Sequence, residues 1–341
     1  MGSPMIDENT CVVFTPAGSG QSDDFSRKTL PSSRMALTSI DLCGVDLSTP
    51  IVLAAGTCGY VDEMADALDL ARVGAVTTKS ITREPRGGNQ PTRILDARAG
   101  MINAIGLANM GLERFIAEKA PVAAAVPTRV IGSVAGGTVE EYVEIAARFD
   151  SIDAIPIIEL NVSCPNTDDG RHASDDPDRL RSLLVEVRAA VTSSRLFVKL
   201  PPNTEGLVRL AAAAVEGGAD GLTMTNTLEV MSIDVDSRKS RLTRPRMGYS
   251  GPGIHPLSVR LVHQVYREFA REAGVPIIGT GGVSDWRDAA EMILAGATAV
   301  GMGTALYIDP RSPIRVVDGL ERWVRSQGCS SIGALVGAFE G

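Results

Sequence analysis

A single cysteine, Cys164, lies between two asparagines, Asn161 and Asn166, in the segment ELNVSCPN. A thiol at the end of a strand can act as a nucleophile or as a general base. Most cysteines are small apolar core residues instead, so position has to decide between the two interpretations. Cys58 also follows an apolar run and is a weaker candidate for the same chemistry. The polar stretch 166–176 that follows is expected to be a mobile lid.

Two glycine-rich turns follow the last two apolar runs of the chain, GTGG at 279–282 and GMGT at 301–304. In a parallel α/β barrel, the loops after strands seven and eight frequently bind a phosphate through backbone N–H groups. Glycine also ends strands for steric reasons, so one such turn is weak support. Two turns at this place in the strand order favour a phosphate site.

Two lysines and several amides stand at strand ends. Lys79 ends one apolar run, and Lys199 lies inside another, FVKL. A lysine in a covered strand costs free energy unless it is paired, faces a ligand or extends to the rim, and two of them favour charge stabilisation. Amides supply donors and acceptors together, which suits a planar ligand with carbonyl and N–H groups. They stand at Asn103, Asn109, Asn161, Asn166 and Asn226.

Short apolar runs, often β-branched, are the elements that must position these side chains. Each run has four or five consecutive apolar residues, as is typical of parallel strands covered on both faces. The eight runs are Ile51–Ala54, Ala75–Thr78, Arg129–Gly132, Ile157–Asn161, Phe197–Leu200, Gly221–Thr225, Pro276–Gly279 and Ala299–Met302.

Helical patterns alternate with these runs, and Thr138 with Glu141 predicts a capping box. Eight strands alternating with helices predict an α/β fold, a (β/α)8 TIM barrel. A doubly wound open sheet, the alternative, would have fewer strands and an early GxGxxG turn. Two stretches, 80–125 and 228–253, are expected to be long active-site loop insertions. The helices are expected at Asp62–Val73, Thr138–Phe149, Pro177–Ala190, Thr204–Glu216, His255–Ala273, Ser284–Leu294 and Pro313–Ser326.

Composition limits the function classes. The chain has 341 residues and a net charge of −8, which argues against a nucleic-acid partner. No apolar run reaches the ~18 residues of a membrane span. Five cysteines without a CxxC pair and three histidines favour a cytoplasmic protein without a disulfide framework or structural zinc. Residues 1–34 are polar and are expected to be a disordered leader before a single domain, 35–341.

Five motifs in consistent order resemble the dihydroorotate dehydrogenase family, and the resemblance runs from about Leu37 to about Ile308. Members of that family are flavin-dependent (β/α)8 barrels that oxidise dihydroorotate to orotate in pyrimidine biosynthesis. The resemblance therefore implies an oxidoreductase that binds FMN. The motifs are TKSITREPRGGN at 78–89, MINAIGL at 101–107, LNVSCPN at 160–166, DGLTMTNT at 220–227 and SGP at 250–252.

The resemblance also implies roles for individual residues. It places the FMN phosphate on Gly281, Gly282, Gly303 and Thr304, in agreement with the glycine turns. Other neighbours of the flavin would be Ala55, Gly56, Lys79, Ser80, Asn161, Lys199, Thr225 and Gly251. The substrate would be held by Lys79, Asn103, Ala104, Ile105, Gly106, Leu107, Asn161, Asn166, Asn226 and Thr227.

Cys164 would be the general base that removes a proton from C5 of dihydroorotate, while a hydride passes from C6 to the flavin. Lys199 would place positive charge near the flavin ring and stabilise its anionic reduced form. An unperturbed thiol has a pKa of ~8.5, so activity should rise from neutral to mildly alkaline pH. A flat pH profile would count against this assignment.

The cysteine also implies a class within the family. The membrane-associated class uses serine as the base and has an apolar N-terminal segment, so the chain is more similar to the soluble class 1, and within it to the NAD-linked 1B subtype. That subtype works with a separate FAD and iron–sulfur subunit, and no cysteine cluster here would hold iron–sulfur. We therefore expect a homodimer or a heterotetramer with such a subunit. The pair Glu229-Val230 departs from the family pattern and leaves the loop after the sixth strand in question.

Two alternatives remain open from the sequence. A dihydropyrimidine dehydrogenase-like flavoprotein acting on uracil or thymine shares the barrel, the flavin and the cysteine, although Asn166 favours orotate. A non-catalytic barrel is the alternative from a different class, and it predicts a colourless purified protein.

Overall fold

The computed structural model describes residues 37–163, 174, 176–202 and 205–341. Eight parallel strands close into a barrel in the order β10-β15-β16-β3-β4-β7-β8-β9, so the predicted (β/α)8 architecture is confirmed. The strands are β3 (Ile51–Leu53), β4 (Ala75–Thr77), β7 (Arg129–Val134), β8 (Ile157–Asn161), β9 (Arg195–Leu200), β10 (Gly221–Met224), β15 (Ile277–Thr280) and β16 (Ala299–Met302).

Strand register brings polar residues of neighbouring strands to the same height in the barrel. Asn161 on β8 pairs with Lys199 on β9, and Lys199 pairs in turn with Thr223 on β10. One layer lower, Glu159 pairs with Phe197. Side chains alternate across a strand, so this register places Asn161, Lys199 and Thr223 together on the inner face.

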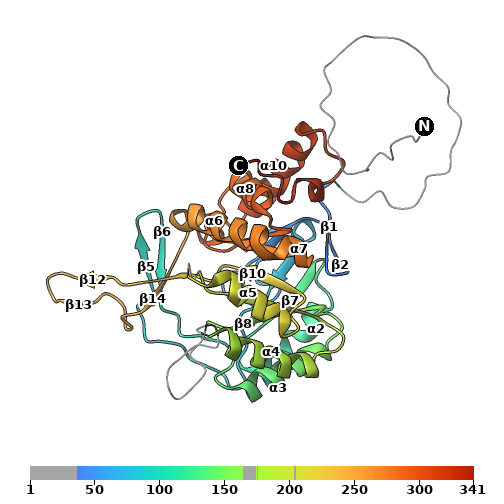
Figure 1. The fold of residues 1–341 in the computed structure, drawn as a ribbon. Coiled ribbons are helices and arrows are strands. Elements are labelled where there is room, and N and C mark those ends of the chain that lie inside the picture. The colour runs from blue at the N-terminus through green and yellow to red at the C-terminus, as the bar shows by residue number, and fades with distance from the viewer. Residues whose placement is uncertain (1–36, 164–173, 175, 203–204) are drawn as a thin grey trace, which may run out of the picture.

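Helices surround the barrel (Figure 1). They bury one apolar face each. Three of them begin at a side chain that accepts a backbone hydrogen bond: Thr138 accepts from the Glu141 N–H, Asp176 from the Asp178 N–H and Asp285 from the Arg287 N–H. The larger ones are α3 (Val139–Asp150), α4 (Pro177–Ala190), α5 (Leu207–Glu216), α6 (His255–Val265), α8 (Trp286–Ala295) and α10 (Ser312–Ser326). After α6 a π-helical turn (Tyr266–Ala270) and α7 (Arg271–Ala273) continue the helix to the predicted end.

The prediction of a helix over Asp62–Val73 was wrong. The segment forms turns and a short 3-10 helix, η1 (Leu70–Arg72). The Glu63 carboxylate accepts hydrogen bonds from the N–H groups of Tyr60 and Val61 and lies 2.8 Å from the Lys119 ammonium. These contacts satisfy the backbone in a turn and tie it to a distant segment, which outweighs helix propensity.

Two other helix starts differ from prediction. Thr138 does cap α3, but the Glu141 carboxylate accepts from the Gly137 N–H at 2.7 Å rather than from Thr138, so the capping box is not formed. Helix α5 begins at Leu207 because Gly206 before it has a left-handed backbone with φ 76°. The predicted first residue of that helix, Thr204, lies outside the described residues.

The two long insertions fold together. Strands β5 (Ile94–Ala97) and β6 (Gly100–Asn103) of the first pair with β14 (Met247–Ser250) and β11 (Leu228–Val230) of the second, in the antiparallel order β11-β14-β6-β5. Glu229 and Val230, where the sequence departs from the family pattern, belong to β11. The first insertion also holds α1 (Leu112–Glu118) and α2 (Ala120–Ala123), and a hairpin of β12 (Ile233–Asp234) and β13 (Lys239–Ser240) projects from the second (Figure 1).

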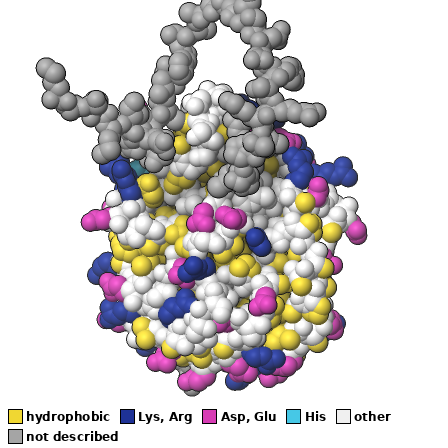
Figure 2. Space-filling view, turned by 90° about the vertical axis from the view of Figure 1, so that its right-hand side faces the viewer, with side chains coloured by type: hydrophobic (Ala, Val, Ile, Leu, Met, Phe, Trp, Pro, Cys, Tyr) yellow, Lys and Arg dark blue, Asp and Glu magenta, His cyan; other side chains and the backbone are white. Residues whose placement is uncertain are grey.

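A small antiparallel hairpin, β1 (Ile40–Leu42) and β2 (Val45–Leu47), lies on the side of the barrel away from that sheet (Figure 1). The described residues contain no helix long and apolar enough to span a membrane. On the face in Figure 2, basic and acidic side chains are interspersed, with hydrophobic ones between them. The predicted leader, 1–34, lies outside the described residues.

Candidate active site

A cavity of about 730 Å³ lies at the carboxyl ends of the barrel strands, a size typical of small-molecule sites. Every described residue to which the family resemblance gave a role in the site lines it. These are Ala55, Gly56, Lys79, Ser80, Asn103, Ala104, Ile105, Gly106, Leu107, Asn161, Lys199, Thr225, Asn226, Thr227, Gly251, Gly281, Gly282, Gly303 and Thr304. Cys164 and Asn166 lie outside the described residues, so their placement stays a prediction.

The two glycine turns form one corner of the cavity. Gly282 has φ 72°, and a Cβ there would lie 2.8 Å from the carbonyl oxygen of Gly251, so only glycine fits this close approach. The N–H groups of Gly282, Val283, Gly303 and Thr304 donate to no acceptor within the described part of the chain. Four unpaired N–H groups at one corner can bind the oxygens of a phosphate.

His255 supports this corner, and sequence reasoning missed it. Its side chain is 7% exposed, and its Nδ1 lies 2.9 Å from the carbonyl oxygen of Gly281. On the other side of the ring, Nε2 lies 3.3 Å from the Glu291 carboxylate. The histidine therefore holds the first glycine turn in place. The sequence indicated it only by its position, four residues after Gly251 of the family motif.

The two lysines reach the cavity from β4 and β9, between which β7 and β8 lie in the barrel. Lys79, after β4, comes so close to the loop after β3 that a Cβ at Gly56 would lie 3.2 Å from its Nζ. Lys199 on β9 is 7% exposed, and its Nζ lies 4.0 Å from the Glu159 carboxylate. The cavity therefore has positive charge on two walls, and this charge suits an anionic ligand.

A chain of side-chain hydrogen bonds runs from β7 to the end of β10. The Ser133 and Ser80 hydroxyls lie 2.9 Å apart, Asn161 Nδ2 donates to the Ser80 hydroxyl, and Asn226 Nδ2 donates to Asn161 Oδ1 at 3.1 Å. Asn226 Oδ1 accepts in turn from the Thr227 N–H. The chain fixes the orientation of the two amides, which is what recognition of a planar polar ligand needs.

Residues 103–107 bring the first insertion to the cavity. The backbone turns at Gly106 (φ 76°) and Leu107 (φ 56°). Asn89 holds the turn, because its N–H donates to the Ile105 carbonyl at 2.9 Å and its Nδ2 to the Ala104 carbonyl at 3.0 Å. Asn89 itself lines the cavity, and its position in the family motif was a signal that the sequence reasoning did not use.

Asn109 has a structural role and does not line the cavity. It is 7% exposed, its Oδ1 accepts from the N–H groups of Thr82 and Gly111, and its Nδ2 donates to the Thr82 hydroxyl and the Leu107 carbonyl. Its side-chain hydrogen bonds hold its own turn and tie that turn to Thr82. Of the five amides predicted at strand ends, Asn109 therefore supports the site without lining it.

Cys58, the competing thiol, is unsuited to act as a base. It is 1% exposed, and its Sγ donates to the carbonyls of Ala54 and Thr77. Burial raises the pKa of the Cys58 thiol to about 12, and the negative charge of Glu63 adds to the shift. Near neutral pH the thiol is protonated and has no path to a ligand.

Comparison with known proteins places the chain in a family. The sequence profile named dihydroorotate dehydrogenase matches residues 37–324. A Pelobacter propionicus protein named "dihydroorotate dehydrogenase B (NAD(+)), catalytic subunit" is 43% identical over 302 residues, which cover 88% of this chain and 98% of the relative. A Bacteroides thetaiotaomicron protein of the same name is 37% identical over 306 residues, 90% of this chain and 100% of the relative. The chain therefore belongs to the dihydroorotate dehydrogenase family of oxidoreductases, within the NAD-linked class 1B that the motifs predicted.

Proposed function

We propose that this chain oxidises dihydroorotate to orotate in de novo pyrimidine biosynthesis, with FMN bound in the cavity and Cys164 as the general base. The observation that carries the proposal is the cavity itself. It combines a corner of unpaired N–H groups, two lysines and a fixed pair of amides at the carboxyl ends of the strands, where barrel enzymes have their active sites.

FMN fits the residues present. The N–H groups of Gly282, Val283, Gly303 and Thr304 would hold its phosphate, and Lys199 would stand near the ring. The buried hydroxyl of Thr225 lines the cavity and has no hydrogen-bond partner among the described residues, so it is available to a polar ring system. When bound, FMN supplies the acceptor for the hydride from C6 of dihydroorotate.

The chain's own residues account for the rest of the chemistry. Cys164 removes the C5 proton, Lys79 pairs with the substrate carboxylate, and Asn161, Asn226 and Thr227 orient the substrate ring. The segment 103–107 completes the cradle from the first insertion. Because the base must carry a negative charge to act, we expect activity to rise from neutral to mildly alkaline pH.

We further propose that the chain works as a catalytic subunit in the cytoplasm. It would form a homodimer and pass electrons to NAD through a separate subunit that holds FAD and an iron–sulfur cluster. The names of the relatives support this, since they are catalytic subunits. The described residues contain no cluster of three or more metal-ligating side chains.

The decisive experiment compares two cysteine variants of the purified chain. The wild type should be yellow, with a flavin spectrum that bleaches anaerobically on addition of dihydroorotate and much less with dihydrouracil. Cys164→Ala should keep the flavin and lose about 10²–10⁴-fold in the rate of bleaching. Cys58→Ala, the matched control, should bleach at close to the wild-type rate.

Four outcomes would contradict the proposal or a part of it. A colourless protein favours the non-catalytic barrel, and faster bleaching with dihydrouracil favours the uracil or thymine enzyme. Unchanged bleaching in Cys164→Ala would overturn the base assignment. Turnover of the isolated chain with fumarate, and none with NAD in the presence of an added FAD and iron–sulfur subunit, would overturn the proposed electron acceptor.

A further inference from the structure

Two opposite charges are buried at the floor of the cavity. Glu159 on β8 is 3% exposed and Lys199 on β9 is 7% exposed, and the carboxylate and ammonium lie 4.0 Å apart. Lys199 lines the cavity. Glu159 lies one layer lower, level with Ser133 and Phe197. The carboxylate therefore supports the lysine from below and is separated from the cavity by it.

Packing alone does not explain the pair. Removing two charges from water costs several kcal/mol per ion, and replacing a buried ion pair by apolar side chains is often neutral or stabilising. The hydrogen bonding around the pair is incomplete, because Glu159 Oε1 and the neighbouring Thr223 hydroxyl have no partner among the described residues. A purpose other than stability is needed to explain charges at this position.

The geometry leaves the lysine available to a ligand. A separation of 4.0 Å is attractive but too long for a hydrogen bond. In the described part of the chain, no hydrogen bond from the Lys199 ammonium is found. The carboxylate therefore limits where the ammonium can move and offsets its charge, while the ammonium keeps its three donors for the cavity.

We propose that Glu159 is a positioning residue that holds the Lys199 ammonium at the cavity floor and thereby sets the reduction potential of the bound flavin. The inference rests on the proposed FMN site. A bare ammonium would stabilise a reduced, anionic flavin strongly, and the adjacent carboxylate weakens that stabilisation. Glu159 thus keeps the flavin easier to reoxidise, which favours electron transfer onward to a partner.

The test is the reduction potential of the flavin in Glu159→Gln, measured against reference dyes. We expect a more positive potential, equivalent to about a tenfold shift towards the reduced flavin, or about 30 mV for a two-electron couple. Glu159→Asp keeps the charge and should move the potential less. Glu186→Gln, which removes an exposed carboxylate on α4, is the matched control and should leave it unchanged.

A second pair of variants tests whether Glu159 acts through Lys199. With Lys199→Met, the carboxylate has no cation to hold, and a buried carboxyl group is then kept neutral by its surroundings. Adding Glu159→Gln to Lys199→Met should therefore change the potential little. A shift as large as in the wild-type background would overturn the proposal, as would a wild-type potential in Glu159→Gln.

A thermal unfolding cycle on the flavin-free protein gives an independent readout. Glu159→Gln and Lys199→Met should each lower the melting temperature, and the double variant should lose less than the sum of the two, because each single change leaves one buried polar side chain without its partner. Additive losses would show that the two side chains do not act as a pair. If the chain bound flavin but did not oxidise dihydroorotate, the proposed function would fail, but the reduction potentials and the melting temperatures of the variants would still test the role of Glu159.

Discussion

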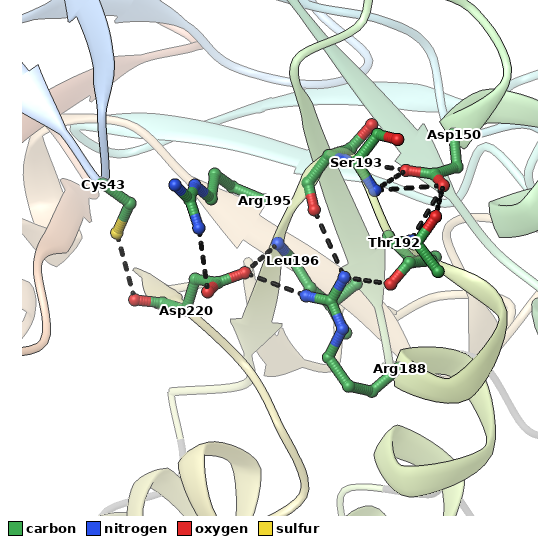
Figure 3. A network of polar contacts seen from close by, with 10 residues as sticks. Cys43, Asp150, Arg188, Thr192, Ser193, Arg195, Leu196 and Asp220 are labelled. Atoms are coloured by element: carbon green, nitrogen blue, oxygen red, sulfur yellow. Dashed lines mark hydrogen bonds and ion pairs between the residues drawn. The ribbon is translucent and has the colours of Figure 1, made fainter.

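The two ends of the barrel treat polar groups in opposite ways. At the amino ends of the strands, the carboxylates of Asp150 and Asp220 accept several hydrogen bonds each (Figure 3). Asp220 accepts from Arg188 at 3.0 Å and from the Leu196 N–H at 2.7 Å, and Asp150 accepts from the N–H groups of residues 192–194. At the carboxyl ends, four N–H groups, the Thr225 hydroxyl and the Lys199 ammonium lack such hydrogen bonds among the described residues.

The difference has a physical basis. An unpaired buried donor or acceptor costs about 1–3 kcal/mol, so the hydrogen bonds of Asp150 and Asp220 at the amino ends contribute to stability. The cavity end instead leaves groups unpaired that a ligand can satisfy. At the amino end the Cys43 thiol is paired as well, because it donates to the Asp220 carbonyl, and burial with the charge of Asp220 raises its pKa to about 11.

The largest effect on stability is expected from Asp220→Ala. It removes the charge-assisted bonds to Arg188 and the Leu196 N–H and leaves Arg188 without its carboxylate. We expect the free energy of unfolding to fall by about 2–3 kcal/mol, measured by urea unfolding. FMN affinity at a temperature where the variant is folded should be unchanged. Loss of FMN binding in this variant would contradict the view that the amino end serves stability and the carboxyl end serves ligand binding.

At the cavity end, Gly282→Ala should weaken FMN binding by about thirty-fold. The new Cβ would meet the Gly251 carbonyl and the His255 backbone N at 2.8 Å, at a φ of 72°, and so it would displace the turn that presents the N–H groups. Fluorescence titration of the flavin-free protein measures the effect. Gly87→Ala, at an exposed glycine with no atom within 4 Å of the new Cβ, is the control and should bind FMN normally.

A smaller effect is expected for the substrate amides. Asn226→Ala removes the bonds to Asn161 Oδ1 and from the Thr227 N–H without touching the glycine corner. We expect about a tenfold rise in the KM for dihydroorotate, equivalent to ~1.4 kcal/mol, with the flavin content unchanged. Steady-state kinetics on the flavin-loaded protein measure it, and an unchanged KM would remove Asn226 from the substrate site.

The smallest effect concerns alkaline stability. The Cys58 pKa is raised from 9.0 to about 12 in the folded protein, so above pH 9 the unfolded chain loses the proton and the folded one keeps it. Stability from this group is therefore complete below pH 9 and declines as the pH rises towards 12. Unfolding free energies measured between pH 8 and 10.5 should fall less steeply in Cys58→Ala than in the wild type. Parallel slopes would show that the thiol is not linked to stability.

Sequence reasoning worked best where a local pattern has one tertiary meaning. The ranges of β8 and β16 and of helix α4 were predicted to the residue, because a short apolar run between helices is buried on both faces wherever it lies in a barrel. It failed for Asp62–Val73, where Lys119, over fifty residues away, holds the turns. The sheet β11-β14-β6-β5 was also not predicted, since it pairs strands more than a hundred residues apart.

The amino-acid sequence by itself determined the barrel, the family and many of the residues that line the cavity, because strand order and motif spacing are properties of the chain. Only the tertiary structure decided which polar groups are satisfied. Asn109 proved to bond to Thr82 and Leu107 outside the cavity lining, Cys58 proved to be buried in the core, and Glu159 proved to face Lys199. Hydrogen bonds and charge pairs depend on distances between strands, and strand register sets those distances only when the barrel closes.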